Sequence, residues 1–222
     1  MIKKILVKLD LRVSNKEEFF IAASNLAKES GLVVDAGMFH QSLMTREEEI
    51  STGIGKRIAF PHANGVFVLE PFLSFIRLKK AIDFNAIDNQ PVDLFFVIGT
   101  PINQEQTHLK ILSRIARELS FTDLKEKLIQ AKTKLEAIDL VNRIFYPYVL
   151  IVTEDEKLIA EAIKLYDNSA NLKIFKNEDD ISLNDIYTAD LKLSTELITE
   201  LTGFSDQLKP NELLWMIKSI TD

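Results

Sequence analysis

The chain has 222 residues, of which 46% are hydrophobic and 27% charged, so it is long and apolar enough to bury a full core. Its formal net charge of −6 provides no general basic excess for neutralising phosphates, and we expect no nucleic-acid partner. It contains no cysteine, which excludes disulfides, zinc–thiolate sites and a cysteine nucleophile and agrees with a cytoplasmic location.

The N-terminal stretch predicts a strand. Its short apolar run is broken by Lys8 and Asp10 and has no cleavage site of small residues, so it is not typical of a signal peptide. No apolar stretch of the sequence approaches the roughly 18 to 20 residues that cross a bilayer. We therefore expect no direct insertion into a membrane.

Two amphipathic helices are expected next. Ser14 is the predicted N-cap of the first, with Glu17 three residues later as in a capping box, and Gly31 is expected just beyond its end. The second helix is expected over residues 35–48, followed by a loop over residues 51–55. Its inward-facing residues are predicted to be the apolar ones at helical spacing, Phe39, Leu43 and Met44.

The middle of the chain predicts a sheet. Strands are expected over residues 57–60, 67–69, 73–78 and 91–100. The last of these is apolar on both faces, which is typical of a central strand covered from both sides. An amphipathic helix is expected from Thr107, and a further helix over residues 121–131. Together these elements predict an α/β domain, a mixed sheet covered by helices on both faces.

The pattern restarts near residue 146, where we place a domain boundary. Residues 1–146 are expected to form the main domain, and residues 147–222 a small α/β or mostly helical extension of unknown role. The expected elements of the extension are strand 149–152, helix 156–166, strand 172–175 and a mostly helical segment 179–222 with a last helix from Pro210.

His62 is the first candidate for chemistry. It follows a predicted strand and Pro61, whose fixed backbone angle would hold it at a loop tip within reach of a partner. A neutral imidazole is a good nucleophile at physiological pH. Gly53 and Gly55 would let backbone amides approach an anion. The alternative is that the histidine is structural and the two glycines form only a turn.

His108 and Arg46 are the other two candidates. His108 is expected near a helix start, where free backbone donors favour an anion, or else as an exposed helix residue. Arg46 would clamp a phosphoryl group with parallel hydrogen bonds, or else it is one solvated charge beside residues 47–49. His40 is interpreted as a surface or packing residue. No close pair of histidines and no thiolate is present, so we expect no metal site.

Three segments resemble one known family in the right order. The sequence T-G-I-G-K-R-I-A-F-P-H-A, from Thr52 to Ala63, is similar to a stretch of the fructose/mannitol-type enzyme IIA family of the bacterial phosphotransferase system. In that family the stretch ends in the phosphorylated histidine. Upstream, residues 46–47 resemble the family's R-E pair with its active-site arginine. Downstream, residues 108–109 resemble the helix start that supplies a second active-site histidine.

The resemblance covers roughly residues 4–145 and includes the segment 82–94 between the two histidines. Two departures stand out. Ala81 and Asn89 occupy positions where the family commonly has glycine, and Arg57 stands where it often has a small residue. The extra charge of Arg57 would suit an anionic phosphoryl group or alter which partner docks.

The resemblance implies a phosphoryl carrier, a transferase component of the phosphoenolpyruvate-dependent sugar phosphotransferase system. His62 would accept the phosphoryl group from the phosphocarrier HPr, His108 would donate a hydrogen bond to its oxygens, and Arg46 would offset its charge. No metal or organic cofactor is implied. In sugar-transporting relatives the next acceptor is a cysteine on a IIB domain, and this chain has no cysteine. Its acceptor would therefore be a separate IIB protein.

Two other functions stay open. In nitrogen-type IIA relatives the phosphorylation state itself controls a partner protein, and sequence alone does not separate that role from onward transfer. A degenerate binding module without phosphorylation is disfavoured, because all three candidate residues are present. Residues 147–222 contain no histidine, and we expect docking, a regulatory contact or dimerisation from them. The sugar and the oligomeric state, including a homodimer, are left open.

Overall fold

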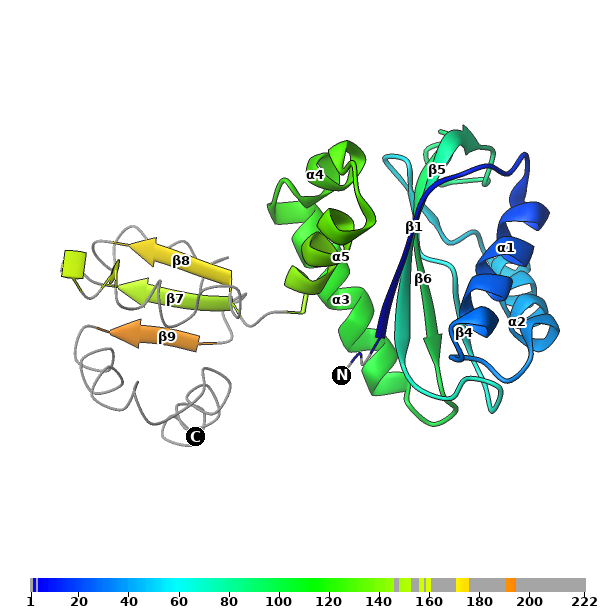
Figure 1. The fold of residues 1–222 in the computed structure, drawn as a ribbon, viewed down its shortest axis with the longest axis horizontal. Coiled ribbons are helices and arrows are strands. Elements are labelled where there is room, and N and C mark those ends of the chain that lie inside the picture. The colour runs from blue at the N-terminus through cyan, green and yellow to red at the C-terminus, as the bar shows by residue number, and fades with distance from the viewer. Residues whose placement is uncertain are drawn as a thin grey trace. The chain divides into compact units, whose positions relative to one another are not determined.

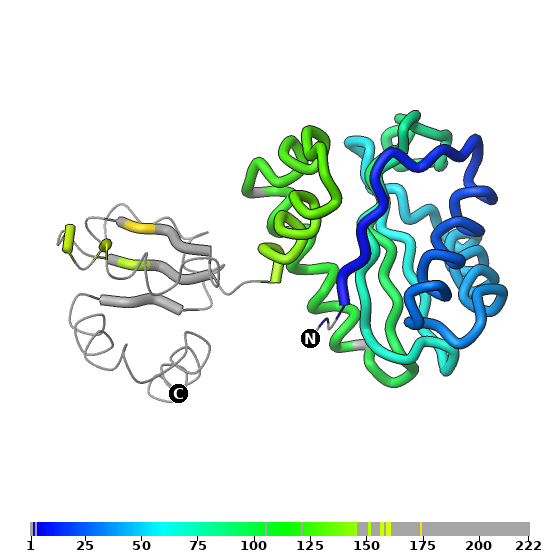
Figure 2. Tube along the Cα trace, viewed as in Figure 1, coloured from blue at the N-terminus to red at the C-terminus, as the bar shows by residue number. Residues whose placement is uncertain are grey.

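The computed structural model describes residues 2, 4–145, 148–152, 156–157, 159–160, 171–175 and 191–194. The chain forms two compact units, Met1–Ile144 and Phe145–Asp222. Figure 2 follows the first unit along the chain by colour. All three candidate residues lie in the first unit.

The first unit contains a six-stranded sheet and the helices α1 to α5. In chain order its elements are β1 (Lys4–Leu11), α1 (Lys16–Glu29), α2 (Ala36–Glu49), β2 (Gly53–Gly55), β3 (Ile58–Ala59), β4 (His62–Asn64), β5 (Phe72–Ile82), β6 (Val92–Thr100), α3 (Glu105–Phe121), α4 (Leu124–Gln130) and α5 (Lys134–Arg143).

The sheet is mixed and is covered on both faces, as predicted. Its strand order is β1-β5-β6-β3-β2, and β4 also pairs with β6. β1 runs parallel to β5, β5 antiparallel to β6, and β3 and β4 both parallel to β6. All residues of β6 are buried, which confirms it as a central strand. In Figure 1, α1 and α2 cover one face of the sheet, and α3, α4 and α5 cover the other.

Phenylalanine rings lock α1 and the loop before β6 onto the sheet. The ring of Phe19 in α1 stacks on that of Phe95 in β6, with 3.9 Å between centroids. Phe84 meets the Phe95 ring edge-on at 5.1 Å. Each buried aromatic contributes about 150–250 Å² of contact surface, and such pairs add about 0.5–1.5 kcal/mol. α2 packs beside α1 with Phe39 and Leu43 buried, so the last turn of α2 has a fixed position over the sheet.

The first helix begins one residue later than predicted. Its N-cap is Asn15, not Ser14: Asn15 Oδ1 accepts from the Glu18 N–H at 2.9 Å. Glu18 Oε2 in turn accepts from the Ser14 N–H at 2.7 Å. Asn and Ser are equally good N-caps, so residue type alone does not choose between neighbours. Gly31 follows the helix with a φ of 69°, which confirms the predicted end.

The segment before His62 is more ordered than predicted. Where a loop was expected over residues 51–55, β2 pairs antiparallel with β3 in a tight hairpin. The two turn residues, Lys56 and Arg57, both have positive φ angles of 53° and 71°. Asp88 Oδ2 accepts from the Lys56 N–H at 2.8 Å and holds this turn. Positive φ at both positions is typical of a type I′ hairpin turn, which usually takes Asn or Gly, so the Lys-Arg pair in the sequence gave no sign of it.

Three further predictions are corrected. His62 is not at a loop tip: it begins β4 and pairs with Ile98 of β6. Residues 67–69 form no strand, since Val68 makes only an isolated bridge to Val33. α3 begins before the predicted start at Thr107. The predicted helix over residues 121–131 is confirmed as the shorter α4, and α5 had no counterpart among the predicted elements.

The second unit contains a parallel three-stranded sheet. Its strands, in the order β8-β7-β9, are β7 (Tyr148–Val152), β8 (Asn171–Phe175) and β9 (Leu191–Ser194). β7 and β8 confirm the two predicted strands, and residues 156–157 and 159–160 of the predicted helix are helical. β9 corrects the prediction of a mostly helical segment over residues 179–222. The helix predicted from Pro210 lies outside the described residues.

Candidate functional site

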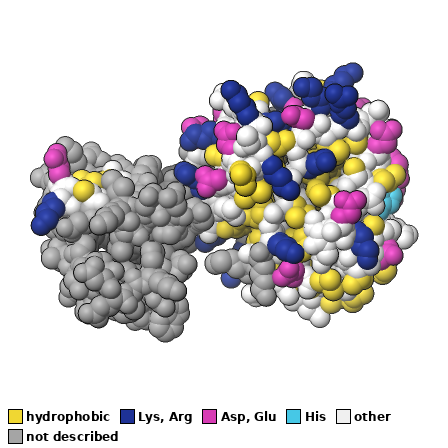
Figure 3. All heavy atoms as spheres, in the orientation of Figure 1, with side chains coloured by type: hydrophobic (Ala, Val, Ile, Leu, Met, Phe, Trp, Pro, Cys, Tyr) yellow, Lys and Arg dark blue, Asp and Glu magenta, His cyan; other side chains and the backbone are white. Residues whose placement is uncertain are grey.

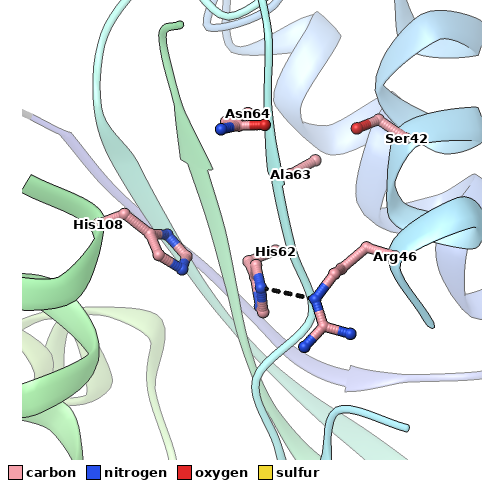
Figure 4. Close-up of a pocket in the computed structure, with 6 residues that line it drawn as sticks. All are labelled: Ser42, Arg46, His62, Ala63, Asn64 and His108. Carbon is pink, nitrogen blue, oxygen red and sulfur yellow. Dashed lines mark hydrogen bonds between the residues drawn. The ribbon is translucent and has the colours of Figure 1, made fainter. Parts of the chain in front are cut away.

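The three residues predicted for the site line one pocket. It has a volume of about 240 Å³ and lies where α2, β4 and the first turn of α3 meet. Its lining residues are Ser42, Arg46, His62, Ala63, Asn64 and His108. In Figure 4, Arg46, His62 and His108 gather at one end of the pocket, and Ser42 and Asn64 lie toward the other.

His62 is held at both ring nitrogens. Nδ1 lies 2.9 Å from the carbonyl oxygen of Phe60, and Nε2 accepts a hydrogen bond of 3.1 Å from Nε of Arg46. A carbonyl oxygen only accepts and an arginine N–H only donates. Nδ1 therefore carries the ring hydrogen and Nε2 carries the lone pair. The nucleophilic atom of this imidazole is Nε2, and it faces the pocket side on which Arg46 lies.

Arg46 reaches His62 from the last turn of α2. Its Nη1 donates to the carbonyl oxygen of Ile50 at 3.0 Å, just past the helix end. This bond uses a carbonyl that the helix leaves without an intrahelical partner. Arg46 is therefore half-buried and directed, and the alternative of a freely solvated charge is wrong. Ser42 lies one helical turn earlier, on the same face of α2.

His108 approaches His62 from the opposite side. The two rings have centroids 4.5 Å apart and planes tilted by 47°. His108 is in the first turn of α3, and its own N–H is used by the carbonyl of Gln104 at 3.1 Å. Its imidazole, and not its backbone amide, is therefore the group offered to the pocket.

The pocket favours neutral imidazole at His62. Burial is the main cause that lowers the pKa of His62, and the charge of Arg46 lowers it further. The carbonyl of Phe60 opposes this, as do the carboxylates of Glu47 and Glu49, which raise the pKa. The net direction is downward, so His62 keeps its lone pair at neutral pH.

His108 is shifted further in the same direction. Burial first, and then the neighbouring His62 and Arg46, lower the pKa of His108 to about 4. At neutral pH its ring is therefore uncharged and offers one N–H donor. An anion in the pocket would reverse the electrostatic part of this shift, because it favours the protonated ring.

The two glycines and Arg57, all considered as contributors to an anion site, lie elsewhere. The Gly53 N–H donates to Oγ of Ser51, and Gly55 has a φ of 88° within the hairpin. The Arg57 guanidinium pairs with the carboxylate of Asp93. None of them lines the pocket. The prediction of a glycine-lined anion site is therefore wrong, because these residues belong to the β2–β3 hairpin and its turn.

Sequence reasoning missed Ser42, Asn64 and Glu47. Ser42 and Asn64 line the pocket, and a signal was available: Ser42 lies one turn before Arg46 on a helix, and Asn64 lies two residues after His62 on a strand. Glu47 does not line the pocket but is buried beside it. Its place in the helical repeat of buried residues was the available signal.

His40 lies outside the pocket, with its Nε2 3.1 Å from Glu17 Oε1 on α1. Among the residues described, no group of three or more potential ligand side chains is arranged to hold a metal ion. The helices in that part of the chain also include none that is both long and apolar enough to span a bilayer.

Residues 1–144 match the family model described as "Phosphoenolpyruvate-dependent sugar phosphotransferase system, EIIA 2". The chain therefore belongs to this family of phosphotransferase components, which confirms the resemblance found in the sequence.

Curated relatives include fructose-specific components of the phosphotransferase system and nitrogen regulatory proteins. A fructose-specific EIIA component of Haloferax volcanii is 35% identical over 136 residues, covering 61% of this chain and 88% of the relative. A nitrogen regulatory protein of Klebsiella oxytoca is 36% identical over 129 residues, covering 58% of this chain and 78% of the relative. A fructose-specific EIIABC component of Bacillus subtilis is 30% identical over 143 residues, covering 64% of this chain but only 22% of the relative.

Solved structures show the same fold. The nitrogen regulatory protein IIA-Ntr from Neisseria meningitidis superposes with a TM-score of 0.57 at 30% identity, covering 61% of this chain and 92% of that one. The IIA mannitol structure from Escherichia coli gives a TM-score of 0.52 at 22% identity, covering 61% of this chain and 94% of that one.

Proposed function

We propose that this chain is a phosphoryl carrier that takes a phosphoryl group onto Nε2 of His62 and passes it to another protein. The observation that carries the proposal is the arrangement of His62. Its Nδ1–H is fixed by the Phe60 carbonyl, and its Nε2 lone pair lies in a pocket beside Arg46 and His108.

The transfer needs neither water nor an external base. The Nε2 lone pair of His62 forms the new N–P bond, while the old N–P bond breaks and returns its electron pair to the donor imidazole. The Nδ1–H stays in place throughout, so no proton has to move on His62. Most of the catalysis is therefore positioning and charge stabilisation, as is general for phosphoryl transfer.

The other two residues act on the phosphoryl oxygens. Arg46 gives up its hydrogen bond to Nε2 when the N–P bond forms, and its N–H groups then face the phosphoryl oxygens. Charge-assisted bonds of this kind are about twice as strong as neutral ones. His108 faces His62 from the other side and donates its ring N–H to another oxygen. The transferred group is thus held between two donors.

The donor and acceptor proposed are proteins. HPr, carrying phosphohistidine, is the donor, and a cysteine on a separate IIB protein is the acceptor, because this chain contains no cysteine. The Haloferax volcanii relative, a fructose-specific EIIA component matched over 88% of its length, supports the transport role.

Incubation with phosphoenolpyruvate, enzyme I and HPr tests the proposal. One phosphoryl group should be added per chain, in an acid-labile and base-stable linkage, and peptide mapping should place it on His62. The variant His62→Ala should take up none, whereas His40→Ala, which removes a histidine outside the pocket, should match wild type. Full uptake by His62→Ala would rule out the assigned residue.

A second function, control of a partner by the phosphorylation state, is supported by the 36% identity to the Klebsiella oxytoca nitrogen regulatory protein. The two functions differ in the last step. A transport component passes its phosphoryl group to a IIB protein encoded nearby, whereas a regulatory one keeps it. Phosphorylated chain mixed with candidate IIB proteins separates them, since only the transport role predicts transfer to a IIB cysteine.

A further inference from the structure

Hydrogen bonds link the site into a closed ring that includes a residue outside the pocket. The carboxylate of Glu47 accepts from the Thr52 N–H at 2.9 Å and from Thr52 Oγ1 at 2.5 Å. The Thr52 carbonyl accepts from the Phe60 N–H at 3.0 Å. The Phe60 carbonyl faces Nδ1 of His62. Nε2 of His62 accepts from Arg46, which is joined to Glu47 by a peptide bond.

Glu47 differs sharply from the acidic residues that follow it. Its side chain is only 3% exposed, whereas Glu48 and Glu49 are exposed. Lys16 at the start of α1 lies 3.0 Å from Glu47 Oε1 and balances the buried charge. A buried carboxylate is stable only when it is paired and hydrogen-bonded in this way. Glu47 therefore anchors the last turn of α2 to the start of β2 and to α1.

We propose that Glu47 is a positioning residue of the phosphoryl site, which aligns Arg46 and His62 by fastening the α2 end to the strand segment that carries the Phe60 carbonyl. The proposal rests on the proposed function of His62. Glu47 touches no atom of the transferring group, because the pocket lining does not include it. It acts through Thr52 and Phe60 on one side of the ring and through the backbone of Arg46 on the other.

The geometry explains why a carboxylate is needed at this position. Each group that approaches the Glu47 oxygens is a donor: the N–H and hydroxyl of Thr52, the ammonium of Lys16 and the hydroxyl of Ser51. A glutamine of the same size would turn an NH₂ group toward donors and lose the charge. The α2 end and the β2 strand would then move apart. A displacement of about 1 Å in a reacting group can cost on the order of 100-fold in rate.

The test compares Glu47→Gln with Glu48→Gln, an identical change at the exposed neighbouring position. Three quantities are measured on the full chain: the melting temperature, the NMR signals of the His62 ring nitrogens without phosphate, and the rate of transfer from phosphorylated HPr. For folded Glu47→Gln we expect altered ring signals and a maximal rate about 10- to 100-fold lower. The KM for HPr should be unchanged, because a buried side chain touches no partner. Glu48→Gln should match wild type in all three.

A folded Glu47→Gln with wild-type ring signals and wild-type rate would overturn the positioning role. If Glu47→Gln does not fold, Thr52→Val tests the positioning role. It removes the hydroxyl that donates to Glu47 in the hydrogen-bonded ring and keeps the buried charge. Altered NMR signals of the His62 ring nitrogens and a slower transfer from HPr then support the positioning role of Glu47. Wild-type signals and a wild-type rate contradict it. If wild-type chain takes no phosphate from HPr, the proposed function fails, and the ring signals alone decide the role of Glu47.

Discussion

Arg46 and His108 are both half-buried and direct their side chains toward His62. Arg46 donates hydrogen bonds to His62 and to the Ile50 carbonyl, and the imidazole of His108 faces that of His62. Losing one such hydrogen bond costs about 1 kcal/mol of unfolding free energy. Their effect on phosphoryl transfer should be much larger than their effect on folding.

We predict that Arg46→Ala and His108→Ala melt close to wild type and exchange phosphate with HPr far more slowly. Removing a donor that stabilises developing charge typically costs about 2.7–4 kcal/mol, or about 100- to 1,000-fold in rate. Arg46→Lys should recover only part of the rate, because an ammonium keeps the charge and loses the planar fork. Rapid-quench transfer assays and thermal melts check this. Wild-type rates in both alanine variants would leave His62 as the only functional residue of the three.

The pH dependence of uptake follows from the shifted imidazoles. Only neutral His62 is nucleophilic, and protonation removes the lone pair as the pH falls through its pKa. Because that pKa is lowered, uptake should persist below about pH 6.5, where an unshifted imidazole is mostly protonated. The rate of transfer from phosphorylated HPr across pH 5 to 8 checks this, after correction for the titration of HPr itself. A midpoint for the chain above about pH 6.5 contradicts the downward shift.

Some residues were predictable from their neighbours in sequence, and others were not. His62 and Arg46 could be recognised because they lie in segments with a distinctive order of residue types. Glu47 was read with Glu48 and Glu49 as one charged run, because three adjacent carboxylates look alike until the fold buries one of them. Its spacing gave a clue, since it is one helical turn beyond the buried Leu43.

At the scale of elements, the β2–β3 hairpin precedes His62 in the chain and packs closely against the loop before β6. Gly53 in β2 lies against the next loop so closely that an added Cβ would be 2.8 Å from both Cα and Cβ of Ala86. The Gly53 carbonyl also accepts from the Ile87 N–H at 3.0 Å, which fixes the spacing of the two segments. Moving β2 away from the loop at Ala86 would therefore break this hydrogen bond and cost free energy of folding.

We predict that Gly53→Ala lowers the free energy of unfolding by about 1–3 kcal/mol, the usual cost of overpacking. Urea titration measures it. Gly37→Ala is the matched control: Gly37 lies in the first turn of α2, where the added Cβ meets only the Asp35 side chain, and alanine favours a helix. That control should stay within about 1 kcal/mol of wild type. Equal stabilities for the two variants would show that β2 and the loop can separate without cost.

The elements that sequence predicted best are those with a long and clear hydrophobic pattern, whether periodic or continuous. β6 contains the apolar run Leu94–Ile98, and its central place in the sheet followed from that run. Short strands such as β2 and β4 have too few residues for a period-2 pattern, and their pairing with distant strands decides their conformation. For this reason the sequence singled out His62 as a candidate but predicted its local structure wrongly.

For the whole molecule, the two compact units raise the question of which one the carrier function needs. The family match covers residues 1–144, and the pocket lies within them. The face of this unit seen in Figure 3 mixes basic, acidic and hydrophobic side chains, as ordinary solvated surfaces do. These facts support residues 1–145 as a separately folding domain.

We predict that a chain ending at Phe145 folds cooperatively and accepts phosphate from HPr at a rate within a few-fold of the full chain. Its sheet and the helices α1 to α5 need no strand from the second unit. Circular dichroism melting and the transfer assay check this. An insoluble or molten fragment beside a well-folded full chain would show that residues 146–222 complete the core.

The most direct test of a phosphoryl carrier is whether it can pass an accepted phosphoryl group back to HPr. The chain is phosphorylated, separated from phosphoenolpyruvate, enzyme I and HPr, and then mixed with an equal amount of unphosphorylated HPr. A carrier that holds its phosphoryl group as an N–P bond on His62 should pass it back, and phosphorylated HPr should appear as the phosphorylated chain disappears. If the phosphoryl group is lost only as inorganic phosphate, and none reaches HPr, the chain is not the carrier proposed here.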